Sequence, residues 1–426
     1  MINILGVNIS NLNQSETLSR VRNFLVDGQQ HLIFTPNPEM LVDSQTDWFF
    51  KTALNKADLA PADGFGLVLA ARYLYKIFLN RFPGVELMEK ICELAAQENK
   101  SIYLVGGKKG IAAQTASVLL KKYPNLKIVG MEMGIVIKFQ IPNPKSQTNS
   151  KYQIPNTKYL VGMSFDQQAN QELLDRINRA APDVLFVAFG HKKQEKWLAE
   201  FIGELPSTKI GMGVGGSFDY LSGKISYAPE FLRRLGLEWF WRLVQEPRKR
   251  IRRIWKAIVS FGFLIYDYKR QLVRPYRQGA IGFIINQEGK FFIAKRRRCG
   301  LDPLDCWQPP QGGINKNETA EHAVLREIKE ETGITAVRIV AQCSKAVSYD
   351  WAIAYMRRAC RGQYRGQAKQ IFLLQYFGDG SDIKVDKDEF DDYKWVSLEE
   401  FKKILHPFRR ESLEILLKEC GHLISK

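Results

Sequence analysis

Over the first 225 residues, short apolar runs alternate with longer stretches in which apolar residues recur with the period of an α-helix. Alternation of this kind is typical of βαβ units, which place their strands side by side in one mostly parallel sheet. We therefore expect an α/β domain over residues 1–228. The runs expected as strands are 32–34, 102–105, 184–189 and 210–214, and the stretches expected as helices include 85–97 and 110–123.

The chain has 426 residues, enough for two or three domains. The segment 135–159 is rich in Asn, Pro, Lys, Gln and Ser, and we expect an inserted loop there. Residues 229–274 are expected to form a basic, aromatic helical appendage and linker, with ten basic and two acidic residues between positions 242 and 274. A strand-like run at 280–285 then opens a second domain, over residues 275–426.

The composition is that of a folded globular protein, because 45% of the residues are hydrophobic and 25% are charged. It excludes a disordered or collagen-like chain. Lys and Arg outnumber Asp and Glu by 62 to 45, which gives a formal net charge of +17. This excess indicates a polyanionic partner, which is a nucleic acid, a phosphorylated metabolite or an anionic membrane. For residues 229–274 three interpretations stay open: a solvated helix face, a segment at a lipid surface, and an RNA-binding surface.

The sequence contains no expected targeting or membrane-spanning segment. Its N-terminus reads as a first strand and lacks the features of a signal peptide. The longest apolar window, 257–266, has ten residues, whereas a spanning helix needs about 20. The six cysteines show neither zinc-ligand spacing nor a disulfide framework. We expect a cytoplasmic protein, with peripheral attachment to the inner face of the cell membrane left open.

Three glutamates in the second domain point to metal chemistry. On a helix, Glu327, Glu330 and Glu331 fall within an arc of about 100°, and their mutual repulsion is relieved if the face binds Mg²⁺ or Mn²⁺. Glu318 and Arg326 would then form an ion pair that holds the preceding loop on the helix. The alternative is an ordinary charged helix whose glutamates pair with neighbouring Arg and Lys.

The spacing of this segment resembles the signature of the Nudix hydrolases: Gly312-x5-Glu318-x7-Arg326-Glu327-Ile328-x-Glu330-Glu331-x-Gly333-Ile334. Segments 307–314, 366–375 and 389–397 add a resemblance to the branch that hydrolyses RNA 5′ ends and dinucleoside polyphosphates. The resemblance implies an α/β/α sandwich that acts on nucleoside polyphosphates or RNA 5′ ends with Mg²⁺ or Mn²⁺.

The same resemblance implies a role for each of the matching residues. The implied metal ligands are Glu327, Glu330, Glu331 and Glu389, of which Glu330 and Glu389 would also be catalytic, Glu389 as a further ligand or the base that activates water. Arg277 and Arg296 would face the phosphates. Gly312, Glu318, Arg326 and Gly333 would be structural.

In the first domain, Asp63 lies in an Asp-Gly turn after an apolar stretch, where a strand is expected to end. Open α/β sheets bind ligands at that edge, and the Asp63 carboxylate could take the proton of an attacking hydroxyl. Plain turn chemistry is the alternative. The spacing Gly211-x-Gly213-x-x-Gly216 also satisfies the dinucleotide fingerprint, which would indicate a nicotinamide enzyme instead.

Residues 1–255 carry several motifs in a fixed order, among them Thr35-Pro-Asn37-Pro-Glu39, Pro61-Ala-Asp63-Gly64, Arg81-x-x-Gly84, Gly190-x-x-x-Gln194-Glu195-Lys-Trp197 and Gly213-Val-Gly-Gly216-Ser-Phe-Asp219. By their order and number, these motifs resemble the WecG/TagA/CpsF family of glycosyltransferases. That resemblance implies a Rossmann-like domain that passes an N-acetylmannosamine-type sugar from UDP to a polyprenyl-diphosphate-linked acceptor at the membrane surface, without a metal or other cofactor. Asp63 would be the catalytic base, and arginines at 233, 234 and 242 would pair with UDP. The residues implied to bind donor and acceptor are Thr35, Asn37, Arg81, Gln194, Gly213, Gly215 and Gly216.

Taken together, the two resemblances predict a bifunctional enzyme, a glycosyltransferase joined to a Nudix pyrophosphohydrolase. In the alternative, only the Nudix half is catalytic and the N-terminal half is a nucleotide-sugar or membrane-binding module. The sequence leaves the donor sugar, the acceptor lipid, the exact Nudix substrate and the oligomeric state open, a homo-oligomer included.

Overall fold

The computed structural model divides the chain into two compact units, Met1–Lys269 and Arg270–Lys426. Each unit is described by itself. The residues that the structure describes are 1–135, 138–139, 163–229, 231–232, 238–245, 247, 251, 255–297, 307–351, 362–405 and 407–424.

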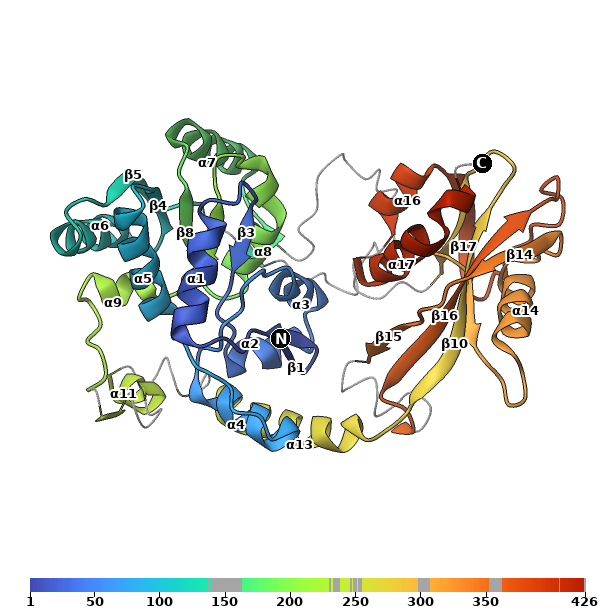
Figure 1. The fold of residues 1–426 in the computed structure, drawn as a ribbon, viewed down its shortest axis with the longest axis horizontal. Coiled ribbons are helices and arrows are strands. Elements are labelled where there is room, and N and C mark those ends of the chain that lie inside the picture. The colour runs from blue at the N-terminus through green and yellow to red at the C-terminus, as the bar shows by residue number, and fades with distance from the viewer. Residues whose placement is uncertain are drawn as a thin grey trace. The chain divides into compact units, whose positions relative to one another are not determined.

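Among the described residues of the first unit, five strands form a parallel sheet in the order β3-β9-β8-β4-β5. Every neighbouring pair is parallel, so the predicted Rossmann-like sheet is confirmed (Figure 1). Buried runs form β4, β8 and β9, because helices cover both faces of the sheet there. The strands are β3 (His31–Ile33), β4 (Ser101–Gly106), β5 (Lys127–Glu132), β8 (Val184–Ala188) and β9 (Ile210–Gly213).

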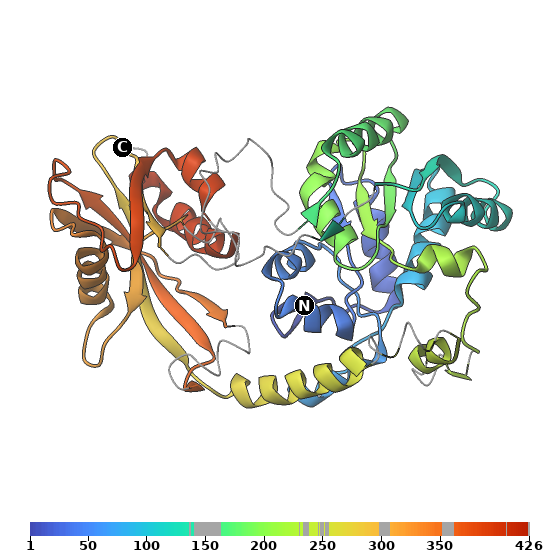
Figure 2. The same ribbon diagram turned by 180° about the vertical axis from the view of Figure 1, so that it is seen from behind.

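Helices cover both faces of this sheet, as Figures 1 and 2 show from opposite sides. One set shares a buried core with the strands through residues such as Val21, Ile91 and Leu119. On the other face, Trp197 is fully buried. The first set is α1 (Gln14–Phe24), α5 (Gly84–Gln97), α6 (Ile111–Lys122) and α9 (Ser217–Leu221), and the second is α7 (Gln167–Ala180) and α8 (Lys193–Phe201), followed by the short helix η1 (Ile202–Glu204).

The N-terminal strand exists as predicted, but it pairs outside the central sheet. β1 (Ile2–Ile4) and β2 (Val7–Ile9) form an antiparallel hairpin. Leu5 and Gly6 connect them with positive φ angles of 56° and 80°, the conformation that the tightest hairpin turns require. Three helices follow between β3 and α5: α2 (Pro38–Ser44), α3 (Trp48–Asn55) and α4 (Phe65–Tyr75).

The basic segment is helical where it is described, in α11 (Glu238–Gln245), η2 (Lys256–Ser260) and α13 (Phe261–Leu272). Lys269 of α13 donates a hydrogen bond to the Leu74 carbonyl of α4. The arginines at 233 and 234 and the side chain of Arg242 lie outside the described residues, as does most of the loop expected at 135–159, which is flanked by β6 (Lys138–Phe139) and β7 (Met163–Ser164). In the described part of the chain, no helix has the length and apolar character needed to cross a bilayer.

The second unit contains a mixed sheet of eight described strands. β10 (Tyr276–Ile285) runs parallel to β16 (Gly366–Tyr376) at its centre. The other pairings are antiparallel. The remaining strands are β11 (Phe291–Arg296), β12 (Trp307–Gln308), β13 (Gln311–Gly313), β14 (Val337–Gln342), β15 (Val347–Asp350) and β17 (Phe390–Val396).

Two separate cores lie on the two faces of this sheet. α14 (Ala320–Thr332) buries Val324 and Ile328 against one face. α16 (Leu398–Ile404) and α17 (Pro407–Ile424) bury Phe401 and Leu416 against the other. The predicted α/β/α sandwich is therefore confirmed. Alternate residues of β10 and β16 enter opposite cores, as the two-residue period of a strand requires.

Candidate active sites

The carboxyl ends of the first unit's parallel strands collect the polar loops at one edge of the sheet. Thr35 follows β3, Gly107 follows β4, Gly190 follows β8 and Gly215 follows β9. Because these strands are parallel and adjacent, their carboxyl ends meet at the same edge, where open α/β sheets bind ligands. Thr35, Asn37, Gly215 and Gly216 lie in these loops, Gly213 ends β9, and Gln194 lies at the start of α8.

Backbone contacts bring three of the candidates together. The Asp63 N–H donates to the carbonyl of Pro36, 2.8 Å away, which places Asp63 beside the turn that carries Asn37. Ala62 forms a parallel bridge with Arg81, so the chain directly before Asp63 is paired with the segment that carries Arg81. The Asn37 side chain caps α2, since its Oδ1 accepts a hydrogen bond from the Met40 N–H at 3.0 Å. Its amide NH₂ group is not used by this cap.

Thr35 packs against the first residue of α5. A Cβ added at Gly84 would lie 2.7 Å from the Thr35 hydroxyl oxygen, so only a glycine leaves room for the threonine there. The motif Arg81-x-x-Gly84 thus has a physical reason, because its two ends support Asp63 and Thr35.

Gln194 holds the glycine loop after β9. Its Oε1 accepts a hydrogen bond from the Gly215 N–H at 3.0 Å, and its Nε2 donates to Glu195 at 2.8 Å. A Cβ at Gly213 would lie 3.0 Å from this amide. The structure therefore brings Gln194, Gly213 and Gly215 together. Gly216 follows directly, at the N-terminus of α9.

The rival dinucleotide-binding interpretation does not fit this loop. In that fingerprint the glycines form the turn between a strand and a long helix. Here Gly211 and Gly213 lie inside β9, and the helix that follows, α9, has only five residues.

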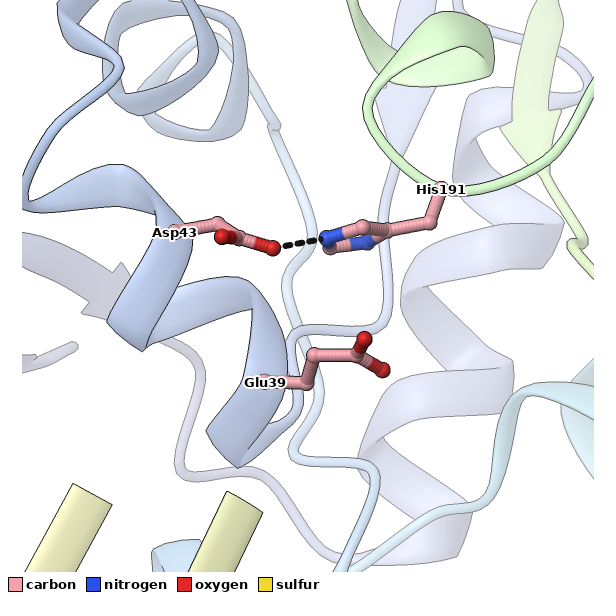
Figure 3. A group of neighbouring side chains, drawn as sticks. All are labelled: Glu39, Asp43 and His191. Carbon is pink, nitrogen blue, oxygen red and sulfur yellow. Dashed lines mark hydrogen bonds and ion pairs between the residues drawn. The ribbon is translucent and has the colours of Figure 1, made fainter. Parts of the chain in front are cut away.

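A group of polar residues that the sequence did not reveal lies beside Asn37 and Gln194. Glu39 and Asp43 of α2 face His191, which precedes α8 (Figure 3). His191 Nε2 lies 2.6 Å from Asp43 Oδ2, and Lys192 Nζ lies 3.5 Å from the other carboxylate oxygen. The ligand atoms of Glu39, Asp43 and His191 all lie within 4.8 Å of one another, as in a metal site. Since the Asp43 carboxylate already lies beside the His191 ring and the Lys192 ammonium group, we interpret the group as a polar network between α2 and the start of α8. The i, i+4 spacing of Glu39 and Asp43 was the available sequence signal.

In the second unit, the signature residues fix a loop on the start of α14. Arg326 donates to both carboxylate oxygens of Glu318, at 2.7 and 3.0 Å, and to the Gly313 carbonyl at 2.9 Å. The Arg326 hydrogen bonds lower the pKa of Glu318 to about 2. Gly333 ends the helix with a positive φ of 74°, and a Cβ there would lie 2.7 Å from the Asp382 carbonyl.

Arg326 also pairs with two of the predicted metal ligands. One of its NH₂ groups donates to Glu327 at 2.9 Å and to Glu330 at 2.8 Å. The carboxylate of Glu327 lies over Gly312, where an added Cβ would come within 1.8 Å of it. The two features explain why a glycine and an arginine occupy these positions, since together they hold Glu327 in place.

Glu331 is the buried member of the acidic group. Its side chain accepts a hydrogen bond from the Gln311 N–H at 3.0 Å. Burial raises the pKa of Glu331 to about 8, and the charges of Glu327 and Glu389 add to the effect. Two other carboxylates, Glu327 of α14 and Glu389 in the loop before β17, therefore act electrostatically on Glu331.

This donor set fits a hard divalent cation. It consists of carboxylate oxygens, the ligands that Mg²⁺ and Mn²⁺ prefer, and a bound cation would offset the burial and the like charges that raise the pKa of Glu331. Glu327, Glu331 and Glu389 would hold such an ion, with Glu330 at the exposed side of the group, where its side chain is 59% exposed.

The two arginines expected to face phosphates lie near this acidic group. A Cβ at Gly313 would lie 2.5 Å from Arg277 Nη2, so the Arg277 guanidinium covers the residue next to Gly312. Arg296 ends β11 and pairs with Phe390, the residue after Glu389. A third cation, Lys369, was missed, because a single lysine in a strand that also contains three glutamines gives no sequence signal.

A parallel α/β unit with polar loops at one sheet edge, joined to a mixed sandwich with an acidic helix face, defines a two-domain enzyme. Residues 2–275 match the model of the glycosyl transferase WecG/TagA/CpsF family, and residues 275–416 match the NUDIX domain. The first match covers more than half of the chain, so the chain belongs to the WecG/TagA/CpsF family. Both predicted resemblances are confirmed.

Curated relatives match the N-terminal part. A protein of Bacillus subtilis (strain 168) is 29% identical over 229 residues, which is 54% of this chain and 75% of the relative. One of Staphylococcus aureus (strain MW2) is 26% identical over 273 residues, 64% of this chain and 94% of the relative. Each is an N-acetylglucosaminyldiphosphoundecaprenol N-acetyl-beta-D-mannosaminyltransferase.

Solved structures match the C-terminal part. A Caenorhabditis elegans Ap4A hydrolase complex is 20% identical with a TM-score of 0.28, covering 35% of this chain and 99% of its own. The Escherichia coli dihydroneopterin triphosphate pyrophosphohydrolase is 21% identical with a TM-score of 0.28, and the match covers 35% of this chain and 99% of the other.

Proposed function

We propose that this chain is a bifunctional enzyme. Its N-terminal domain transfers an N-acetylmannosamine-type sugar from UDP to a polyprenyl-diphosphate-linked acceptor, and its C-terminal domain hydrolyses phosphoanhydrides of nucleoside polyphosphates or RNA 5′ ends with Mg²⁺ or Mn²⁺. The activity of the curated relatives supports the first half. The observation that carries the proposal is that backbone contacts hold Asp63 beside Asn37 and Arg81 in the first unit, and that Glu327, Glu330 and Glu331 lie on one helix in the second.

In the transfer reaction, Asp63 acts as the base. Its carboxylate accepts the proton of the acceptor hydroxyl while that oxygen forms a bond to the anomeric carbon of the sugar, and the bond from this carbon to the UDP oxygen breaks on the opposite face. Gln194 fixes the Gly213–Gly216 loop, and glycines there allow the backbone to approach the diphosphate closely. Thr35, Asn37 and Arg81 line the same edge of the sheet.

In the hydrolysis, the acidic group and the arginines have different roles. Glu327, Glu331 and Glu389 would hold a divalent cation, and the cation would supply positive charge to the phosphate oxygens beside the scissile bridge. Glu389 or Glu330 accepts a proton from the water that attacks phosphorus, and the bridging oxygen leaves with the other phosphate. Arg277 and Arg296 bind the phosphate oxygens and orient them.

Two single substitutions test the two halves separately. Asp63→Asn should abolish sugar transfer from UDP-N-acetylmannosamine to a synthetic polyprenyl-diphosphate acceptor and leave hydrolysis of diadenosine polyphosphates and triphosphorylated RNA unchanged. Glu330→Gln should do the reverse. Each variant serves as the control for the other in the same full-length chain. Unchanged transfer in Asp63→Asn, measured where the wild type is active, would show that the transferase assignment is wrong.

We also propose peripheral attachment to an anionic membrane surface, because the acceptor lipid resides there. α4 starts two residues after Asp63. It presents Phe65, Leu69 and Tyr73, three exposed apolar side chains four residues apart, to solvent. Together with the basic residues of α4 and α13, this face has the character of a membrane-surface helix.

A further inference from the structure

Lys192, the residue directly before α8, has a backbone conformation that few residues other than glycine adopt. Its φ is 67° and its ψ is −36°, and a Cβ makes a positive φ sterically unfavourable. Lys192 nevertheless carries a long side chain at a position that suits glycine. Strain of this kind persists where the surrounding contacts offset it, and it is concentrated at functional sites. The contacts of the Lys192 side chain therefore indicate what this residue does.

The Lys192 side chain lies between two acidic residues that come from an earlier part of the chain. Its Nζ lies 3.5 Å from Asp43 Oδ1, in the last turn of α2, and 3.7 Å from Asp47 Oδ2, at the N-cap of α3. His191 Nε2 lies 2.6 Å from Asp43 Oδ2 (Figure 3), and Lys196 Nζ lies 2.9 Å from Asp47 Oδ1. These four contacts hold α2 and α3 on the start of α8.

Most of this contact region is shielded from water. The side chains of Asp43 and Lys192 are 10% and 21% exposed, and salt screens such partly buried pairs much less than exposed ones. The His191 ring also packs against Phe50 of α3, which is fully buried, in an edge-to-face contact with ring centroids 5.2 Å apart. The contacts therefore form a stiff connection between α2, α3 and the start of α8.

One end of this connection supports the turn that carries Asp63. The first residue of α2, Pro38, packs against the glycine that follows Asp63, since a Cβ added at Gly64 would lie 3.2 Å from Pro38 Cδ. The Asp63 N–H donates to the Pro36 carbonyl at 2.8 Å, two residues before α2. A shift of α2 would therefore shift Asp63.

The other end of the connection supports the glycine loop after β9. Gln194 lies two residues after Lys192, in the first turn of α8, and its amide oxygen accepts from the Gly215 N–H. The Gln194 backbone N–H donates to the Gly190 carbonyl at 3.2 Å, so the turn that contains Lys192 is closed on Gln194. A shift of this turn would therefore shift the glycine loop.

We infer that His191 and Lys192 are positioning residues for sugar transfer, which set the distance between Asp63 and the glycine loop by holding Asp43. The inference rests on the proposed transferase function and deepens it, because it names the residues that align the base with the donor. Neither side chain touches the substrate in this role. Alignment matters because the attacking hydroxyl and the anomeric carbon have to meet in line, and a misplacement of about 1 Å can slow a reaction about 100-fold.

Lys192→Gly tests this role, because it removes the side chain and the backbone strain together. The assay is transfer from UDP-N-acetylmannosamine to a short-chain polyprenyl-diphosphate acceptor by the full chain. We expect kcat to fall about tenfold, and KM for the donor to stay within about twofold of the wild type. The melting temperature should not fall, since glycine adopts a positive φ without strain. Lys76→Gly is the matched control, because Lys76 is an exposed lysine with a φ of 60°, and it should keep the wild-type kcat and KM.

Three results for Lys192→Gly would overturn the inference. An unchanged kcat would show that the contacts with Asp43 and Asp47 do not affect the reaction. A higher KM for the donor at an unchanged kcat would show that Lys192 binds the donor itself. A lower kcat accompanied by a lower melting temperature would show that the lysine only stabilises the fold.

Asp43→Asn tests the same connection from α2, and it replaces Lys192→Gly if that variant does not fold. The amide keeps the shape of the side chain but loses the charge that strengthens its hydrogen bonds, so kcat should again fall with little change in KM. The double variant should lose no more than the larger single loss, because residues of one network are not additive. Losses that multiply would contradict the inference.

The same measurements separate this inference from the proposed function. If the wild type transfers no sugar, the proposed transferase function fails and the inference fails with it. If the wild type transfers sugar and both Lys192→Gly and Asp43→Asn keep its kcat, the inference alone fails.

Discussion

Gln194 and Gly215 are joined by a hydrogen bond of 3.0 Å, in which the backbone N–H of the glycine loop donates to the amide oxygen of a buried side chain. The residues are 21 positions apart in the sequence. One side chain at the start of α8 thereby fixes the conformation of the loop that follows β9. Since Gly215 has a positive φ of 54°, the loop adopts a shape that few other residues tolerate.

Gln194→Ala should loosen this loop. The substitution leaves the Gly215 N–H without its partner, which costs about 1–3 kcal/mol, and it should raise the KM for the UDP-sugar more than it lowers kcat. Steady-state transfer kinetics and thermal unfolding measure the two effects. Gln168→Ala, at an exposed glutamine whose side chain donates to Glu172, is the control. Equal effects of the two substitutions on KM would contradict the role assigned to Gln194.

Glu331 should make the stability of the second unit depend on pH when no divalent ion is present. Its pKa in the folded protein, about 8, lies above the ordinary value of 4.5 because of burial and the nearby carboxylates. A carboxyl with a raised pKa stabilises the fold fully at low pH, and this contribution is lost as the pH rises from about 4.5 through 8. The loss is on the order of 1 kcal/mol per pKa unit.

The comparison with Glu331→Gln isolates this effect, because the amide can still accept from the Gln311 N–H but does not ionise. In EDTA, chemical denaturation at pH 5, 7 and 9 should show the variant gaining stability relative to the wild type as the pH rises. Mn²⁺ should reduce that difference at pH 9. If the difference in stability does not change with pH, the pKa of Glu331 is not raised in the folded protein.

Gly312→Ala and Gly313→Ala form a matched pair of neighbouring substitutions. The added Cβ at Gly312 meets the Glu327 carboxylate, and the one at Gly313 meets the Arg277 guanidinium. Both obstacles are the ends of flexible side chains, so both variants should fold. Gly312→Ala should weaken Mn²⁺ binding, measured by titration calorimetry, about tenfold or more, as loss of a supporting contact does at metal sites. Gly313→Ala should keep Mn²⁺ affinity and raise the KM for the phosphate substrate. If both substitutions changed Mn²⁺ affinity and KM in the same way, the separate roles of Gly312 and Gly313 would be contradicted.

Much of the fold follows from local patterns. The strands at β4, β8 and β9 and the helices α5 and α6 lie within one or two residues of the apolar runs and helical stretches in the sequence, because both periods are fixed by backbone geometry. The acidic face of α14 follows for the same reason, since Glu327, Glu330 and Glu331 are spaced for one helix face. The position of β1 outside the central sheet does not follow, because a three-residue apolar run fits any strand.

The parts of the sites that escaped prediction depend on packing between distant segments. Asp43 meets His191 across 148 positions, and Lys369 meets Gln311 across 58. The periodicity of helices and strands in the sequence does not predict either contact. The alternation in β16 places Lys369 on one of two faces, and only the position of α17 decides that this face is buried.

The exposed apolar face of α4 leads to a prediction for membrane binding. Leu69 is 54% exposed on this helix, and Phe263 of α13 is 70% exposed; α13 is bonded to α4 through Lys269. If these side chains enter the headgroup region, Leu69→Glu and Phe263→Glu should each lower co-sedimentation of the full chain with anionic vesicles about tenfold, since burial of one such side chain is worth about 1.5–3 kcal/mol. Val118→Glu changes a side chain that is 40% exposed on α6 and should bind as the wild type does. If all three variants bind vesicles as the wild type does, the vesicles contact another surface. High salt should weaken wild-type binding only in part, because salt does not screen the apolar contribution.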